Sequence, residues 1–540
     1  MKKVMALLLA GMMVLSMGTA LAGEDPTIRA KERETVVLTI GVQGNATVDS
    51  WEDNTQTKMI EEALNVDLQF IEMPVSATEF RQKVEMMLLS NEKLPDMFWG
   101  KFDFASVTQW GVNGLVLPTT EYYRNNTYYI DETCQHTQLT KDEMLSYVTS
   151  YDGNVYGLFA ITESLNNQYS GCRLIVYKPW LDALGMDMPK TTEEFYNMLV
   201  RFRDEDPNGN GIADEIPMVG CTDYVSANML RVLMNPFQYT QAGYYYNDNG
   251  TVAFSPLTDE WREGLKWINK LYNEGLLNPL SFTQDTVAFN AMMNNEDATI
   301  VGVHLRGNNG NIDARDIRRT EYEIMEPLEG PNGQKNQVVS PSLPSIRGVI
   351  TKDCQNPQVA FEVADFLCSV EQSVASRWGW EGVDWVQPRE DDIALYADSG
   401  YEAMFTITSS VWSDVGHSIY KQTGPTIVDV RWPVGQAVPA STETYDGSVG
   451  LGKSIWRQVE YANYDNLIPL LIFNQEEQKV VNEFSSTIES YIEEQFALFA
   501  TGEIDVNDDG AWQAYLAEFE YMGLQDYLSA LQSAYDRMYK

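Results

Sequence analysis

The sequence predicts an α/β protein built from two or more lobes. A chain of 540 residues is too long to form a single hydrophobic core. Near its start, residues 35–42 have the pattern of a buried strand, residues 53–64 that of a helix and residues 66–72 that of a second strand. A strand, a helix and a strand in this order are typical of the start of an α/β lobe with a largely parallel sheet.

The same alternation of strands and helices continues along the chain. Further strands are expected at residues 97–99 and 172–177, and further helices at residues 80–89, 180–184, 191–202, 259–273 and 356–369. The C-terminal quarter is expected to be mostly helical. Its apolar residues recur three and four positions apart, at Phe484, Ile488, Ile492, Phe496 and Phe499.

The first residues predict export. Lys2 and Lys3 precede an apolar run over residues 4–15, and an A-x-A cleavage site follows at residues 20–22. We therefore expect a signal peptide at residues 1–22, a linker at residues 23–34, and a mature protein at the cell surface, in the periplasm or secreted. A lipoprotein signal would carry cysteine at position 24, and this chain has Glu24, so the sequence does not support a lipid anchor.

Composition excludes several classes of partner. The formal net charge is −41, which disfavours binding to nucleic acid or to anionic lipid. After the signal peptide, no stretch reaches the roughly 18 apolar residues that a membrane helix requires, so the mature chain is not expected to insert into a membrane. The five cysteines form no CxxC pair, and the three histidines form no H-E-x-x-H motif. At most two disulfides could form, and chemistry based on histidine or zinc is not indicated.

Residues 206–215, with the sequence D-P-N-G-N-G-I-A-D-E, predict a structural calcium site. Oxygen-bearing side chains alternate with small residues, and Gly211 stands at the sixth position, where a calcium loop turns sharply. The expected ligands are Asp206, Asn208, Asn210, the carbonyl of Ile212, Asp214 and Glu215. An EF-hand would carry a bidentate Glu at position 12, and Pro217 stands there, so the loop is EF-hand-like only. The alternative is a solvated acidic turn.

The aromatic residues suggest a sugar ligand. The chain has 13 Trp and 29 Tyr. Aromatic rings stack on the faces of sugar rings, while carboxylates, amides and guanidinium groups bind the hydroxyls. The candidate ligand-binding residues are Trp51, Asn54, Trp99, Arg173, Tyr177, Trp378, Trp380, Glu381, Asp384 and Trp432. The densest group lies at residues 378–385. For each single Trp, packing in the core is the alternative.

Several short motifs occur together in a characteristic order. They are L-P-D at residues 94–96, K-P-W-L-D-A-L-G at 178–185, P-K-T at 189–191, the calcium-type loop, N-K-L-Y-N-E-G-L at 269–276, W-E-G-V-D-W at 380–385, and the tail at 521–536. In these motifs, from about residue 35 to the C-terminus, the chain resembles the extracellular solute-binding proteins of carbohydrate ABC importers. The likeness is greatest to the subgroup that includes the alginate-oligosaccharide-binding proteins.

The resemblance implies a two-lobed periplasmic-binding-protein-like fold of type II. Such a fold has a hinge, a ligand cleft between the lobes and, here, a helical C-terminal part. The expected first lobe comprises residues 35–160 and 346–405, and the expected second lobe comprises residues 161–345 and 406–540. The implied function is capture of an oligosaccharide by a monomer that delivers it to a membrane ABC permease, without catalysis. Because the chain is strongly acidic, we expect a neutral or mixed oligosaccharide.

Two other functions stay open on the sequence alone. The main alternative is a secreted carbohydrate-active enzyme, either a glycoside hydrolase or a lyase. A glycoside hydrolase needs two carboxylates about 5–10 Å apart, and 78 acidic residues neither place nor exclude such a pair. Capture of a peptide or a metal is a third possibility, although the metal version lacks histidines.

One nucleotide-binding motif is expected to be coincidental. Residues 447–454 match G-x-x-x-x-G-K-S, the phosphate-binding P-loop. A P-loop follows a buried strand, whereas residues 441–446 are polar. We therefore expect a Gly-rich loop that caps a helix beginning near Ser454.

Overall fold

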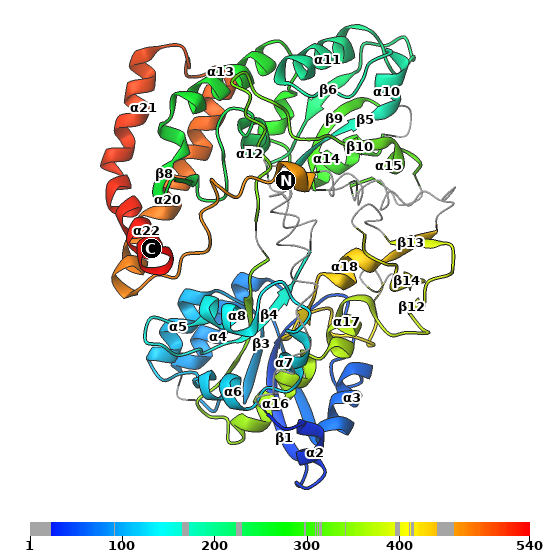
Figure 1. The fold of residues 1–540 in the computed structure, drawn as a ribbon, viewed down its shortest axis with the longest axis vertical. Helices are drawn as coiled ribbons and strands as arrows, with labels where there is room; N and C mark the ends of the chain where they lie inside the picture. The colour runs from blue at the N-terminus through cyan, green and yellow to red at the C-terminus, as the bar shows by residue number, and fades with distance from the viewer. Residues whose placement is uncertain are drawn as a thin grey trace.

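The computed structural model describes residues 23–540 except 91, 165–171, 223–228, 296–298, 308, 310, 313–315, 341, 395–399, 410, 412–414 and 440–457. The predicted signal peptide and the P-loop-like segment therefore lie outside the described residues. The chain forms two α/β units, each built around its own sheet, which stand one above the other in Figure 1. None of the described helices has the length and apolar character needed to span a membrane.

The first unit, the lower one in Figure 1, contains a six-stranded sheet in the order β15-β4-β11-β3-β1-β2. These strands are β15 (Ile427–Val428), β4 (Leu158–Thr162), β11 (Ser345–Ile350), β3 (Met97–Phe102), β1 (Val36–Gln43) and β2 (Val66–Met73). β1 pairs in parallel with β2 and with β3, and α3 (Thr55–Leu64) connects β1 to β2. The predicted strand, helix and strand at the start of the chain are therefore confirmed. β11 runs antiparallel to both β3 and β4 where the chain re-enters this sheet.

Helices cover this sheet and complete the core of the first unit. They are α2 (Pro26–Ala30), α4 (Ala77–Leu89), α5 (Phe104–Val112), α6 (Thr120–Asn125), α7 (Tyr129–Thr133), α8 (Lys141–Val148), α16 (Pro357–Leu367) and α17 (Val370–Trp378). Leu38 and Ile40 of β1, Phe98 of β3 and Phe361 of α16 are fully buried in one hydrophobic cluster. Helix α16 thus belongs to the same core as the N-terminal strands.

The second unit contains a four-stranded sheet in the order β10-β5-β9-β6. Its strands are β10 (Tyr322–Ile324), β5 (Arg173–Tyr177), β9 (Val301–Arg306) and β6 (Ile216–Val219), and the hairpin β7 (Tyr245–Asp248) and β8 (Thr251–Phe254) stands apart. Its helices include α10 (Lys178–Ala183), α11 (Thr192–Asp204), α12 (Met229–Met234), α13 (Asp259–Asn273), α14 (Thr286–Met293) and α15 (Arg318–Glu321). The 3₁₀ turns Ser255–Leu257 and Pro279–Phe282 flank α13.

Three C-terminal helices pack on the second unit, as the apolar spacing of this region predicts. They are α20 (Gln475–Thr501), α21 (Asp509–Tyr521) and α22 (Leu524–Tyr539). Ile488, Ile492, Phe496 and Phe499 of α20 are buried in the core of this unit, and Phe484 packs against it half-buried. In Figure 1 the three helices stand at one side of the upper unit, and the C-terminus lies on the side nearest the first unit.

Short elements after residue 385 form a small region beside the first unit. They are β12 (Trp385–Val386), β13 (Asp392–Ala394), β14 (Thr406–Ile407), α18 (Arg431–Gly435) and β16 (Ala437–Pro439), with a 3₁₀ turn at Val459–Tyr461 farther on. β12 pairs with β14, and β13 pairs with β16.

The sheet corrects one detail of the expected lobes. The sequence assigned residues 406–540 to the second lobe, but β15 at Ile427–Val428 pairs with β4 in the first sheet. Tyr420 and Ile427 are also buried in the core of the first unit. The segment joins the first sheet because Ile427 and Val428 are apolar and pair with the edge of β4, beside Ile161 and Thr162. Segment 415–430 therefore packs with the first unit.

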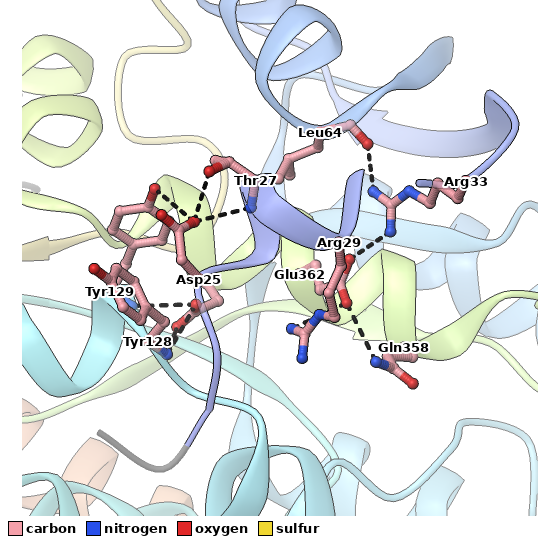
Figure 2. A network of polar contacts seen from close by, with 10 residues as sticks. Asp25, Thr27, Arg29, Arg33, Leu64, Tyr128, Tyr129, Gln358 and Glu362 are labelled. Atoms are coloured by element: carbon pink, nitrogen blue, oxygen red, sulfur yellow. Dashed lines mark hydrogen bonds and ion pairs between the residues drawn. The ribbon is translucent and has the colours of Figure 1, made fainter. Parts of the chain in front are cut away.

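The N-terminal segment, expected to be a linker, is docked on the first unit through a network of polar contacts (Figure 2). The Asp25 carboxylate accepts a hydrogen bond from the Thr27 amide at 2.9 Å and caps α2. Arg29 and Arg33 form ion pairs of 3.1 and 2.5 Å with Glu362 of α16, a residue that is 1% exposed. Arg33 also donates to the carbonyl of Leu64. Residues 25–33 are thus part of the folded unit.

Two buried carboxylates lie where segments of the first unit meet. Glu163, at the end of β4, accepts hydrogen bonds from the amides of Gln138 at 2.6 Å and Val430 at 3.0 Å. Asp365 of α16 accepts from the amides at the start of α7, including Ile130 at 3.0 Å. Burial is the main cause that raises the pKa of Glu163 to about 7 and the pKa of Asp365 to about 6. Both groups therefore hold their protons more tightly in the folded than in the unfolded chain.

These pKa values predict a pH dependence of stability. Because both pKa values are raised on folding, the stability that these groups contribute is fully present below about pH 4 and is lost as the pH rises to about 7. Glu163→Gln should gain stability relative to wild type by on the order of 2 kcal/mol between pH 5 and pH 8. Urea unfolding at both pH values measures this, with exposed Glu483→Gln on α20 as the matched control. The prediction would be contradicted if the free energy of unfolding changed equally with pH in Glu163→Gln and in wild type.

Candidate functional site

The aromatic residues at 378–385 form a small core. Trp378 is 6% exposed and Trp385 is 7% exposed. Both rings pack on Phe405, with centroid distances of 5.2 and 5.7 Å. Trp432 lies 5.4 Å from the same Phe405 ring and is half-buried. In the structure Trp378 packs in a core. This is the alternative that the sequence analysis gave to stacking on a sugar.

Asp384 holds the turn that follows α17. Its carboxylate accepts hydrogen bonds from the Trp380 amide at 2.9 Å and the Ser409 hydroxyl at 2.8 Å. Gly379 has φ of +82°, and a Cβ there would lie 2.1 Å from the Asp384 carboxylate, so only glycine fits. Asp384 is 9% exposed, and its hydrogen bonds stabilise the local fold.

Two residues of this segment reach the surface. Trp380 is half-buried, and its indole N–H donates to the carbonyl of Ser418 at 3.0 Å. Glu381 is exposed, and its carboxylate accepts a hydrogen bond from the side-chain amide of Gln387 at 2.7 Å. Among the predicted residues of the 378–385 segment, these two are the ones that a ligand could contact in this arrangement. Their ligand-binding role stays a prediction.

The three candidates near the start of the chain are buried in the first unit. Trp51 is 3% exposed and Trp99 is fully buried, and their rings lie 5.7 and 5.8 Å from the ring of Tyr420. Asn54 caps α3 by accepting from the Gln56 amide at 3.0 Å, and it donates to the carbonyl of Ile419 at 3.3 Å. These residues join the segment around residue 420 to the first sheet.

The two candidates on β5 lie in the second unit. Arg173 is 3% exposed and donates to the side chain of Gln458 at 3.0 Å and to the carbonyl of Gly307 at 2.6 Å. Tyr177 is half-buried and donates to Glu321 at 2.7 Å. The candidates of the first unit thus meet around residues 418–420, where Trp380 and Asn54 bind neighbouring carbonyls, whereas the two candidates on β5 belong to the second unit. The structure does not gather all of the predicted residues into one site.

A cavity that the sequence did not indicate lies between the two units. Its volume is about 690 Å³, and we call it the interunit cavity. Arg124 of α6, Asp142 of α8 and Tyr151 line it from the first unit. Phe473, Asn474 and Arg537 line it from the second unit, and no residue predicted to bind ligand is among its lining residues. The walls come from segments more than 300 residues apart, so no local pattern in the sequence could reveal the cavity.

The polar side chains of the calcium-type loop are held together by hydrogen bonds within the loop. Asp206, Gly209 and Gly211 all have positive φ, at 47°, 72° and 75°. The Asp206 carboxylate accepts from the Gly211 amide at 3.0 Å. The Asp214 carboxylate accepts from the side-chain amides of Asn208 at 3.0 Å and Asn210 at 3.1 Å. The side chains at the first, third, fifth and ninth positions therefore converge.

Glu215 adds a buried acidic oxygen to this loop. One of its carboxylate oxygens is buried without a hydrogen-bond partner. Burial raises the pKa of Glu215, and the charges of Asp206 and Asp214 raise it further. No group of three or more acidic, histidine or cysteine side chains that could hold a metal occurs in the described part of the chain. The expected ligand set depends instead on two amides and the carbonyl of Ile212 in addition to the acids.

The two α/β units, linked by several crossings of the chain, define the fold of a two-lobed solute-binding protein. No protein-family model matches the chain. Over 492 residues it is 26% identical to the fructooligosaccharide ABC transporter substrate-binding protein FusA of Streptococcus pneumoniae, covering 85% of this chain and 83% of that protein.

Solved structures show the same fold. The human-milk-oligosaccharide (HMO) binding solute-binding protein of Bifidobacterium longum infantis has a TM-score of 0.76 at 19% identity, covering 93% of this chain and 99% of the other. FusA in complex with kestose has a TM-score of 0.72 at 21% identity, with the same coverage of the two chains. The chain is thus similar in sequence and in fold to solute-binding proteins of carbohydrate ABC transporters, as its motifs predict.

Two further structures with the same fold involve an EF-hand or calcium in the other protein. One is an EF-hand mutant of FusA in complex with fructo-nystose, with a TM-score of 0.72 at 21% identity. The other is the alginate-binding protein AlgQ2 without calcium ion, with a TM-score of 0.62 at 18% identity, covering 96% of this chain and 99% of the other.

Proposed function

We propose that this protein is the extracytoplasmic substrate-binding component of an ABC importer, which captures an oligosaccharide and delivers it to a membrane permease. The observation that carries the proposal is the similarity to FusA over 85% of the chain, together with the shared two-lobed fold. The relatives are transport components rather than enzymes. Ligand capture without chemistry is therefore favoured over a secreted hydrolase or lyase.

The negative charge of the chain favours a neutral oligosaccharide over an anionic one. The chain has 37 Lys and Arg against 78 Asp and Glu. A polyanionic glycan would be repelled by such a surface unless the site concentrated cations. The two arginines that line the interunit cavity, Arg124 and Arg537, are already paired, with Glu121 and Glu477. We therefore propose a neutral oligosaccharide as the ligand.

Isothermal titration calorimetry tests this function. The purified chain is titrated with kestose, nystose, maltotriose, raffinose and an alginate trisaccharide as the anionic comparison. We expect saturable one-to-one binding of at least one neutral sugar and no binding of the alginate trisaccharide. If every neutral sugar fails to bind, or if the alginate trisaccharide binds best, the proposed function or its ligand class is wrong.

We also propose that the protein acts outside the cytoplasm as a monomer. The signal sequence at residues 1–22 and the names of the relatives support export. The lobe boundaries at residues 160 and 346 remain proposals, with segment 415–430 reassigned to the first lobe. Light scattering after size exclusion measures the oligomeric state, and a dimer would contradict the monomer.

We infer that the loop at residues 206–215 binds a structural Ca²⁺. The residues fit the ion because the side chains of Asp206, Asn208, Asn210 and Asp214 converge and Glu215 offers a buried oxygen without a partner. Asn208 and Asn210 would turn their side-chain oxygens toward the ion in place of the amide nitrogens that donate to Asp214. Hard oxygen ligands of this kind suit Ca²⁺. The ion would also relieve the repulsion among the three carboxylates. Its role would be to fix the connection between α11 and β6.

Calcium removal should lower stability. Loops of this kind in extracellular modules bind calcium at about 10⁻⁴–10⁻³ M, so about 2 mM calcium should stabilise the protein by about 0.6–1.8 kcal/mol. Thermal unfolding with EGTA and with added calcium measures this change. Asp206→Ala should abolish the calcium response, whereas Asp204→Ala, whose side chain pairs with Arg203 outside the loop, should keep it. A melting temperature that does not respond to EGTA or calcium, together with no metal retained by mass spectrometry, would contradict the site.

A further inference from the structure

The first unit brings two of the cysteines to one place. Cys134 directly follows α7, and Cys368 directly follows α16. The amide of Ile130 donates to Asp365 at 3.0 Å, and the Thr133 hydroxyl donates to the carbonyl of Cys368 at 2.8 Å. Both contacts advance by three residues along each helix, so the two helices run side by side in the same direction and end together (Figure 1).

The two thiols share one environment. Cys368 is 1% exposed in the core of the first unit, and the half-buried Cys134 packs against the same core. Burial is the main cause that raises the pKa of Cys368, and the charges of Asp365 and Cys134 raise it further. Burial also raises the pKa of Tyr123 on α6, and charge on either sulfur adds to this shift. Both sulfurs therefore lie near the same tyrosine and near each other.

The other three cysteines are placed where they cannot pair. A disulfide needs Cα atoms about 4.4–6.8 Å apart. Cys354 precedes α16, whose 11 residues separate it from Cys368 by about 16 Å. Cys172 and Cys221 lie in the second unit, beside β5 and β6, and β9 runs between these two strands. Two strand spacings put them about 9–10 Å apart.

The position of the two cysteines in the chain gives a bond between them a large effect. Cys134 belongs to the first pass of the chain through the first unit, and Cys368 belongs to the segment that returns there. All four strands of the second sheet lie between them in the sequence. A cross-link that closes such a long loop strongly restricts the unfolded chain and so favours the folded one.

We propose that Cys134 and Cys368 form a disulfide in the exported chain, which fastens α7 to α16 and holds the returning segment in the first unit. The oxidant is a small disulfide such as oxidised glutathione. The thiolate of Cys134 attacks it, forms a mixed disulfide and releases one thiol. The thiolate of Cys368 then attacks the sulfur of Cys134 and releases the second thiol. Two S–H bonds are lost and one S–S bond forms, while two electrons and two protons pass to the oxidant.

The bond should form while the chain folds. Burial is the main cause that raises the pKa of the Cys134 thiol to about 12, so its reactive thiolate is scarce in the folded protein. Before α7 docks on α16, both thiols are open to the oxidant. Exported proteins meet oxidising conditions, whereas cytosolic proteins are kept reduced.

Refolding of the full chain tests the proposal. Reduced protein in urea is refolded with oxidised and reduced glutathione, or with reductant alone, and free thiols are then blocked with N-ethylmaleimide. Mass spectrometry of unreduced tryptic peptides counts the blocked thiols and identifies linked peptides. Cys134→Ser and Cys368→Ser each remove one partner. Cys354→Ser is the matched control, because this buried cysteine of the first unit lies at the opposite end of α16. Melting temperatures of the reduced variants verify that each one is folded.

In the wild-type chain we expect the blocked thiols to fall from five to about three, with one link that joins Cys134 to Cys368. Cys354→Ser should form the same link, and the other two variants should form none. The oxidised wild type should melt at least about 3 °C above the reduced protein. Five blocked thiols after oxidative refolding, or a dominant link to another cysteine, would overturn the proposed disulfide. A linked protein that melts no higher than the reduced one would overturn its fastening role. Neither result depends on sugar binding, so the proposed function is tested separately.

Discussion

Trp378→Ala is expected to lower the free energy of unfolding by about 3–5 kcal/mol, because truncation of a buried tryptophan removes its packing and leaves a cavity. Trp378 is 6% exposed, and its ring packs 5.2 Å from the ring of Phe405 and 6.4 Å from that of Trp432. Both partners come from outside α17, so the surrounding chain cannot easily collapse into the space. Urea unfolding monitored by circular dichroism measures the loss.

Trp380→Ala is the matched comparison for this result. Trp380 is half-buried and makes one side-chain hydrogen bond, to Ser418 at 3.0 Å, so its loss should cost about 1–2 kcal/mol. If both rings stacked on a sugar, as the sequence analysis predicts, both variants would keep their stability and lose sugar affinity. The structure reverses this expectation for Trp378. A stable Trp378→Ala protein with weakened sugar binding would show that its ring stacks on ligand and that the buried arrangement is wrong.

Replacing Arg29 and Arg33 together with methionine is expected to cost about 3–5 kcal/mol, because it leaves the buried carboxylate of Glu362 without its counter-charges. Figure 2 shows both arginines reaching Glu362 from the N-terminal segment, at 3.1 and 2.5 Å. Among the described residues, the partner that remains to Glu362 is Gln358, which donates a hydrogen bond of 3.3 Å. Chemical denaturation of the double variant measures the cost.

A third substitution separates charge burial from simple loss of packing. Adding Glu362→Met to the double variant removes the unpaired charge and should recover most of the lost stability. Arg124→Met, which breaks an exposed pair with Glu121, should change stability little. If the double variant unfolds like wild type, the N-terminal segment is not held to the first unit by these ion pairs.

Elements with strong local signals could be predicted from the sequence. The first strands, α11 and α20 follow from apolar periodicity and from caps. The Thr191 hydroxyl accepts from the Glu194 amide at 3.1 Å, while the Glu194 carboxylate accepts from the Thr191 amide. The docking of residues 25–33 could not be predicted in this way. Arg33 pairs with a residue 329 positions away, and no local pattern encodes that contact.

The site was harder to predict than the fold. The proposed calcium ligands at residues 206–215 are close together in the chain, so their pattern could be recognised from the sequence. The tryptophans at residues 378–385 are also close together, but their exposure depends on Phe405 and Trp432, which cover them from other segments. The interunit cavity depends on the position of α22 beside α8, which is a property of the folded chain alone.

We propose that this protein binds a neutral oligosaccharide and does not change it. Equilibrium dialysis tests this proposal with fluorescently labelled kestose, nystose, maltotriose and raffinose. After dialysis, the protein is denatured and the released sugar is analysed by chromatography. For at least one sugar, we expect about one sugar retained per chain and released at its original length. Retention of no sugar, or release of shortened products, would contradict the assignment to ligand capture.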